Sequence, residues 1–151
     1  MKKHELTDDT ITVGGRILHR IKALKSFSDV EEGDLGGYVE KEDNLDHSGD
    51  AWVYGDARVS GDAWVYGNAR VYGNARVSRE NDYAAAKGFG REYRTTTFFR
   101  LQDGGIGVRC GCFCGTLEEF REKVKETHKE SKMGKEYLML ADLMEYKFKN
   151  E

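Results

Sequence analysis

The sequence contains no proline and only three cysteines among its 151 residues. Without proline, the turns must be made by the 18 glycines and by Asp and Asn, which tolerate or favour positive φ. The cysteines lie together at Cys110, Cys112 and Cys114, which argues against a secreted disulfide framework and favours reduced thiols. No apolar run reaches the length of a membrane span and the first ten residues are polar, so we expect a cytoplasmic protein without a membrane partner.

Acidic and basic side chains are nearly balanced, with 27 Asp and Glu residues against 24 Lys and Arg residues. Because these charges are interspersed and the net charge is −3, general nucleic-acid binding by phosphate neutralisation is not expected. Hydrophobic residues make up 38% of the chain, which is enough for a modest core in one domain of this length.

Residues 49–78 contain five consecutive copies of a six-residue repeat. In each copy an alanine and a valine stand two positions apart, so on a strand they share one face, and a Gly-Asp or Gly-Asn pair turns the chain after all but the last copy. The shared positions are Ala51, Ala57, Ala63, Ala69 and Ala75, and Val53, Val59, Val65, Val71 and Val77. A single copy cannot bury its apolar face, so we expect the copies to stack and cover one another.

A period of six predicts a three-sided coil in which residues 18 positions apart lie over each other. Tyr54 would then stack on Tyr72, Ser60 would lie on Ser78, and Trp52 would lie over Arg70 as a cation–π pair. The alternative is an antiparallel meander of four-residue strands joined by two-residue turns, which would make the strands unusually short.

The segment Val53-Tyr54-Gly55-Asp56-Ala57 resembles the hexapeptide-repeat, left-handed β-helix family, in which an aliphatic residue is followed two places on by glycine and a small residue. The match is degraded over residues 33–48. The resemblance implies a left-handed coil, a homotrimer and, as an alternative function, an acetyl-CoA-dependent acyltransferase with His47 or His128 as general base. A single histidine without a catalytic partner is weak evidence for a general base, so the favoured interpretation of His47 is a histidine at the end of a coil, hydrogen-bonded to the backbone.

The fold class that we predict is mainly β: a short left-handed parallel β-helix, a triangular solenoid, between two caps. The predicted parts are an N-terminal β-hairpin cap at 1–32, the repeat solenoid at 33–80, a connector at 81–94, and a C-terminal α+β (ββαα) module at 95–151. The hairpin joins Thr10–Val13 to Arg16–Leu24 through Gly14-Gly15.

The C-terminal module is expected to have two strands, Thr95–Arg100 and Ile106–Cys114, followed by two helices. Thr116 to Glu119 form a capping box that starts the first helix. The second helix should follow Ser131, with its buried face at Met133, Tyr137, Leu140, Met144 and Phe148.

The stretch TTTFFRLQDGGIGVRCGCFCGTLEEFREKVKETH, and GDLGGYVEKEDNL before the repeats, resemble segments of hypothetical proteins of phages and gut bacteria. That resemblance implies a phage or mobile-element origin and no particular reaction, so no catalytic residue is carried over from it.

Two groups of side chains are candidates for binding. The first is the aromatic and cationic set expected on the outside of the repeats, typical of binding surfaces, of subunit contacts, or of side chains that merely stack along the coil. It comprises Trp52, Tyr54, Arg58, Trp64, Tyr66, Arg70, Tyr72 and Arg76. The second consists of Arg94, Arg100 and Arg109 among nearby aromatics, which could hold a nucleotide or phosphate, or could be solvated or paired with acids.

The cysteine run could supply zinc ligands or a nucleophile, but no fourth ligand is evident. On one strand the three side chains would share a face, so we expect them to pack as small apolar residues under the helices. No metal, cofactor or catalytic set is expected.

We therefore expect a non-enzymatic, phage-encoded, homotrimeric binding protein in the host cytoplasm. It would dock on a host protein or sequester a small nucleotide-like signal, and so inhibit host anti-phage defence. The acyltransferase and a purely structural assembly module are the alternatives.

Overall fold

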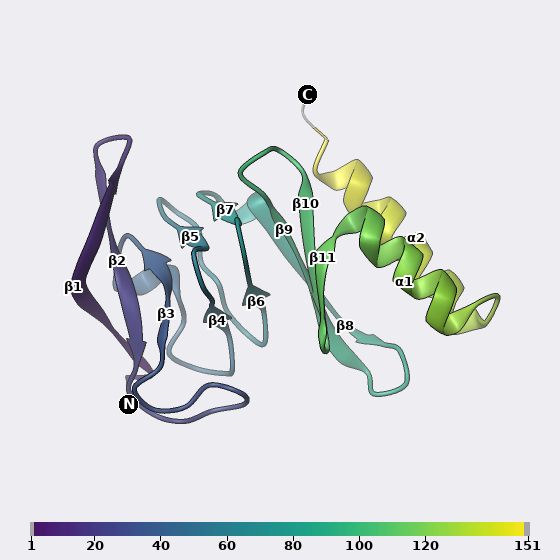
Figure 1. Ribbon diagram of the computed structural model, residues 1–151, viewed down its shortest axis with the longest axis horizontal. Helices are drawn as coiled ribbons and strands as arrows, with labels where there is room; N and C mark the ends of the chain where they lie inside the picture. Colours follow the sequence, from purple (N-terminus) through teal and green to yellow (C-terminus); the bar gives the residue numbers. More distant parts are fainter. Residues whose placement is uncertain (1, 150–151) are drawn as a thin grey trace.

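The computed structural model of the protein describes residues 2–149 and shows three parts in a row (Figure 1). A β-hairpin at the N-terminal end is followed by the repeat segment in the middle. A four-stranded sheet lies beyond the repeats, with two helices on its far side.

The N-terminal part is a long hairpin of β1 (His4–Val13) and β2 (Arg16–Ala23), paired in antiparallel fashion. Gly14 and Gly15 form its turn with φ values of +55° and +81°, a conformation that glycine adopts without a Cβ clash. The hairpin predicted about this glycine pair is thus confirmed. β3 (Leu35–Val39) continues the sheet antiparallel to β2.

The repeats form four strands of two residues each. These are β4 (Trp52–Val53), β5 (Arg58–Val59), β6 (Arg70–Val71) and β7 (Arg76–Val77). β4 pairs with β6 and β5 pairs with β7, both in parallel and both in the predicted 18-residue register. The parallel direction excludes the antiparallel meander.

The predicted left-handed parallel β-helix is nevertheless wrong. β5 and β7 belong to a mixed sheet with the order β1-β2-β3-β5-β7, whereas β4 and β6 form a separate two-stranded sheet. On the remaining side, Leu45 and Val65 make only an isolated parallel bridge. Turns use most of each six-residue copy and leave two residues for pairing. The antiparallel hairpin then occupies the edge of β3, so no sheet within residues 2–149 closes on itself.

The repeats do build the core expected of them. All five repeat alanines and all five repeat valines are at most 1% exposed. Burying an aliphatic side chain of this size contributes about 1.5–3 kcal/mol to stability, so the stacked valines are a main source of stability in this part.

Two short 3-10 helices stand at the two ends of the repeat segment. In η1 (Glu42–Asn44), the buried Asn44 side chain accepts a hydrogen bond from the Lys41 amide at 2.8 Å and donates to the Ala63 carbonyl at 2.8 Å. In η2 (Glu80–Asp82), the buried Asp82 carboxylate accepts from the Ser78 and Arg79 amides at 3.0 and 3.1 Å. Each end is thus held by one buried polar side chain that satisfies backbone groups.

The C-terminal sheet has the order β11-β10-β9-β8 and is antiparallel throughout. Its strands are β8 (Tyr83–Phe89), β9 (Arg94–Arg100), β10 (Ile106–Cys110) and β11 (Phe113–Thr116). Two expectations are corrected here. The segment 81–94, expected to be a connector, contains β8, and the strand expected at 106–114 is two strands joined by a turn at Gly111, whose φ is +59°. The module is therefore ββββαα rather than ββαα.

Both predicted helices are present, as α1 (Leu117–His128) and α2 (Lys132–Lys147). The Thr116 hydroxyl accepts from the Glu119 amide and the Glu119 carboxylate accepts from the Thr116 amide, which confirms the capping box. The helices cover one face of the sheet, where Phe98 and Val108 are fully buried, while Phe99 on the other face joins the core of the repeats. Neither helix has the length and apolar character needed to span a bilayer.

Candidate functional site

The aromatic and cationic set of the repeats is divided by the structure into buried, partly buried and exposed members. Trp52, expected to face outward, is only 1% exposed and meets the edge of the Phe27 ring at a centroid distance of 5.4 Å. The loop before β3 supplies Phe27, and this cover could not be inferred from the repeat itself. Trp52 is therefore a core residue.

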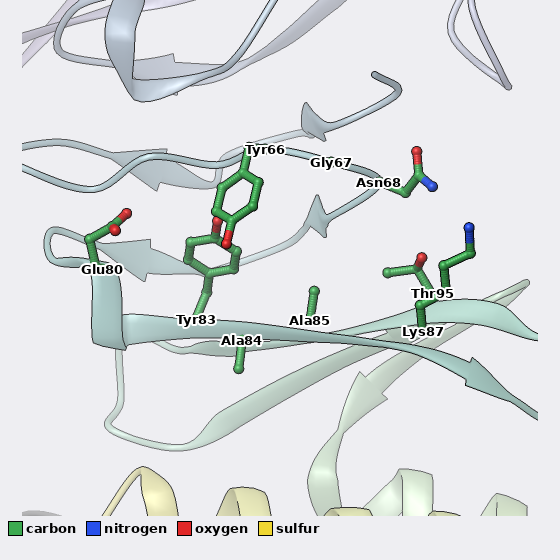
Figure 2. A pocket seen from close by; sticks show the side chains of 9 residues that line it. All are labelled: Tyr66, Gly67, Asn68, Glu80, Tyr83, Ala84, Ala85, Lys87 and Thr95. Carbon is green, nitrogen blue, oxygen red and sulfur yellow. The ribbon is translucent and has the colours of Figure 1, made fainter. Parts of the chain in front are cut away.

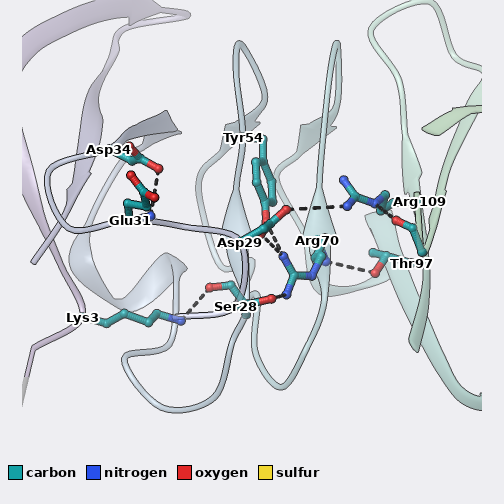
Figure 3. A network of polar contacts seen from close by, with 11 residues as sticks. Lys3, Ser28, Asp29, Glu31, Asp34, Tyr54, Arg70, Thr97 and Arg109 are labelled. Atoms are coloured by element: carbon teal, nitrogen blue, oxygen red, sulfur yellow. Dashed lines mark hydrogen bonds and ion pairs between the residues drawn. The ribbon is translucent and has the colours of Figure 1, made fainter. Parts of the chain in front are cut away.

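Tyr54 belongs to a network of polar contacts that joins all three parts of the molecule (Figure 3), and Tyr72 packs against it. Their rings stack at 3.9 Å, as the 18-residue register predicts. The Arg109 guanidinium of β10 lies 4.3 Å from the Tyr72 ring centroid. The cation–π contact thus involves Arg109 and not the predicted pair of Trp52 and Arg70.

Arg70 and Asp29 form the charged centre of this network. The Arg70 guanidinium donates to Asp29 at 2.7 Å, the Tyr54 hydroxyl donates to Asp29 at 2.8 Å, and the Arg70 amide donates to the Thr97 hydroxyl at 3.0 Å. Burial raises the pKa of Asp29, but the Tyr54 hydrogen bond and the Arg70 charge outweigh it and hold the pKa below its usual value. Burial and the bond to Asp29 raise the pKa of Tyr54. These polar groups satisfy one another's hydrogen-bonding capacity, and their contacts join the segment before β3, the repeats and the C-terminal sheet.

Of three other predicted arginines, two form hydrogen bonds within the fold and the third is half-buried. Arg100 donates to the buried Asp82 at 3.1 Å and to the Phe148 carbonyl at 3.2 Å. Arg76 donates to the Ala75 carbonyl at 2.8 Å and stands beside Arg58 in the β5–β7 register. Arg58 is half-buried there. None of the three lies in a pocket described below.

Trp64 and Tyr66 are the large repeat aromatics that stay exposed, at 45% and 50%. Their rings stack at 4.5 Å, and Tyr66 meets Tyr83 of β8 at 6.5 Å in an edge-on geometry. The Tyr83 hydroxyl donates to the Trp64 carbonyl at 2.5 Å, and burial raises the Tyr83 pKa. Tyr83 was not among the predicted site residues, because it follows the last repeat and its partner is distant in sequence.

A groove of about 320 Å³ lies between Tyr66 and β8 (Figure 2). We call it the β8 groove; its lining includes Tyr66, Asn68, Tyr83, Ala85, Lys87 and Thr95. Tyr83, Ala85 and Lys87 point from β8 toward the repeats, whereas Ala84 points away. β8 is the last strand of its sheet, so the edge away from β9 has no partner strand within residues 2–149.

A second pocket, of about 330 Å³, lies between the sheet and the two helices. We call it the helix pocket. Of the predicted residues, Arg94, Cys110 and His128 line it. Tyr137 of α2 was predicted only as a core residue, yet it also lines this pocket.

His47 is held by the backbone, as one of its two interpretations expected. Its Nδ1 accepts from the Lys3 amide at 3.0 Å, and its ring stacks on His4 at 4.2 Å. His4 is fully buried and neither of its ring nitrogens has a hydrogen-bond partner. Burial, reinforced by the neighbouring His47 and Lys3, lowers the pKa of His4 to about 4.

The three cysteines do not share a face under the helices. Cys112 and Cys114 are exposed, and only the half-buried Cys110 packs against the helix side of the core. The Cys110 thiol accepts from the Thr96 hydroxyl at 3.3 Å and donates to the Tyr137 hydroxyl at 3.6 Å. Within residues 2–149, no three His, Cys, Asp or Glu side chains are grouped as metal ligands.

Comparison with protein families gives one match, to the YdcK beta solenoid repeat, over residues 51–67 and 69–80. No curated protein matches the chain. The match covers the repeats and neither the N-terminal hairpin nor the C-terminal sheet and helices, which contain both the helix pocket and most of the β8 groove. It therefore supports a β-solenoid family for the repeat segment of this chain.

Proposed function

We propose that the protein is a non-enzymatic binding protein that docks on a partner protein through the β8 groove and the Trp64–Tyr66 pair beside it. The observation that carries this proposal is the exposure of two large stacked aromatics near β8, a strand with one edge left unpaired by residues 2–149. Tryptophan and tyrosine are enriched among the residues that dominate protein–protein binding energy.

The occupant that fits best is an extended segment of the partner, added as a strand along β8. The free edge of β8 offers backbone donors and acceptors, which an extended chain can satisfy. Natural edge strands are commonly blocked by charge, proline or a bulge. β8 begins with Tyr83 and three alanines, and its first charge is Lys87, just before the irregular register at Gly88.

The resemblance of the flanking segments to phage and gut-bacterial proteins supports a more specific form of the proposal. In this form the protein is phage-encoded, acts in the host cytoplasm, and docks on a host protein of anti-phage defence. A homotrimer remains part of this proposal on the repeat pattern of the sequence alone, since the left-handed coil of the hexapeptide family is not the fold observed; in it the β8 groove stays free for the partner.

A photo-crosslinking amino acid at position 66, used in cells of the host, tests the occupant. We expect one crosslinked partner whose crosslinked peptide is an extended segment. With that partner purified, Trp64→Ala should weaken binding by about 30-fold, because anchor residues of this kind contribute about 2 kcal/mol. Ala85→Arg, which fills the groove from an exposed position, should abolish binding.

Tyr146→Ala is the matched control, since Tyr146 is 73% exposed and belongs to α2, which covers the face of the sheet opposite the repeats. It should leave the affinity unchanged. Crosslinks only to a second copy of this chain, with assembly lost in Trp64→Ala, would make the groove a subunit contact and contradict the proposal. Equal partner binding by wild type and Trp64→Ala would contradict it too.

A further inference from the structure

We infer that the helix pocket binds a small amphipathic anion, consisting of one aromatic ring and a single phosphate or carboxylate group. This site is separate from the β8 groove. It lies on the helix side of the sheet, where Arg94 and Cys110 line it together with Tyr137 of α2, whereas the groove lies on the repeat side.

The floor of the helix pocket is apolar and aromatic. Phe113 of β11, Phe120 and Val124 of α1, and the Tyr137 ring of α2 supply it. Phe120 meets Phe113 at 5.7 Å and Tyr137 at 5.6 Å, in tilted and edge-on geometries that hold the rings in place. A planar apolar group can therefore enter without rearranging the core.

Two polar groups lie together in the pocket, on the side formed by β10 and α2. The Tyr137 hydroxyl and the Cys110 thiol are bonded to each other there. Gly90, with φ of +79°, lies so close that a methyl group in its place would overlap the Tyr137 hydroxyl. Glycine at this position thus allows the chain to approach the Tyr137 hydroxyl closely, and any side chain here would displace Tyr137.

The rim of the pocket is cationic although the whole chain is acidic. Three permanently charged side chains, Arg91, Arg94 and Lys123, line it against one lining carboxylate, Glu92. Glu92 pairs with Arg94 but is 71% exposed, and Lys123 lies 3.9 Å from the exposed Glu126. Exposed pairs of this kind contribute little, so an incoming anion can replace them. By contrast, Arg100 and Arg109 are committed to contacts inside the fold.

Size limits the ligand further. A volume of about 330 Å³ is near the lower end for small-molecule pockets, which suits one ring with an anionic group and not a dinucleotide. Arginine and lysine at the rim would bind the anionic group by charge-assisted hydrogen bonds while the ring lies on Phe113 and Phe120.

Phenyl phosphate is a suitable probe, with phenylacetate, inorganic phosphate and benzyl alcohol as comparisons. We expect phenyl phosphate at millimolar concentration to shift the amide resonances of residues around the pocket. Inorganic phosphate and benzyl alcohol should bind about tenfold more weakly, because each has only half of the recognised chemistry. If phenylacetate binds as tightly as phenyl phosphate, the result supports the site and shows that the pocket accepts either a carboxylate or a phosphate.

The double variant Arg94→Gln with Lys123→Ala should weaken phenyl phosphate binding by at least about tenfold, since both lost contacts are charge-assisted. Lys87→Ala, which removes an exposed lysine on the opposite face of the same sheet, should not. In a protein with Cys112→Ser and Cys114→Ser, bound phenyl phosphate should also slow alkylation of Cys110. Equal binding of inorganic phosphate, loss of binding in Lys87→Ala, or no resonance shift at millimolar ligand would each overturn the inference.

Discussion

Asp82→Ala is expected to lower the free energy of unfolding by about 3–5 kcal/mol, as found when one partner of a buried ion pair is removed. Asp82 is 2% exposed and accepts hydrogen bonds from two backbone amides and from Arg100 at 3.1 Å. Without the carboxylate, these donors and the half-buried guanidinium lose their partner. Urea unfolding at neutral pH measures the effect.

Two further variants show which lost interaction causes the destabilisation in Asp82→Ala. Asp82→Asn keeps an acceptor for the amides and loses only the charge, so it should cost about 1.5–3 kcal/mol. The amide of Asn44, at the other end of the repeats, shows that such a side chain fits this kind of position. Asn81→Ala, at an exposed position of the same η2, should change stability by no more than about 0.5 kcal/mol. If Asp82→Ala were as mild as Asn81→Ala, the bond between Asp82 and Arg100 would contribute little to stability, which would contradict the role given to this pair.

The protein should lose up to about 3 kcal/mol of stability as the pH falls from 6.5 to about 4, through His4 alone. The folded-state pKa of His4 is about 4 and the ordinary value is 6.5. Above the ordinary value His4 is neutral in both states. Between the two values the unfolded chain takes up a proton that the folded chain refuses, so acid favours unfolding. Urea unfolding across this interval measures the loss.

His4→Leu isolates this contribution from that of the carboxylates, which also respond to acid. Both ring nitrogens of His4 lack partners, so at neutral pH leucine should be equally stable or slightly more stable. The variant should lose about 3 kcal/mol less than wild type across the same pH interval, because the coupled proton is gone. An identical fall in both proteins would show that His4 is not buried in its neutral form.

Much of the fold could be predicted from local pattern. Alanine and valine at fixed positions of a six-residue repeat determined which side chains are buried, and the 18-residue register determined the stacking of Tyr54 on Tyr72. Gly14-Gly15 and the capping box at Thr116 specified a hairpin and a helix start. These features depend on residues that are neighbours in sequence or related by the repeat.

Sheet composition could not be predicted in this way. Strands of two residues form few backbone hydrogen bonds with one another. The sheet that contains β5 and β7 also includes a hairpin whose sequence does not belong to the repeat. β8 was missed because a run of alanines carries no strand pattern, and its conformation is set by pairing with β9.

For the candidate sites, the sequence specifies which aromatic and cationic side chains are present, but the packing of distant segments sets which of them stay exposed. Trp52 and Trp64 occupy the same place in nearly identical repeats. Yet Phe27 covers the first, and the second stays 45% exposed. Arg94 and Arg100 stand at the two ends of β9, and one lines a pocket while the other binds Asp82. The reason is physical: burial and pairing depend on what a distant segment places opposite each side chain, which a repeating pattern does not encode.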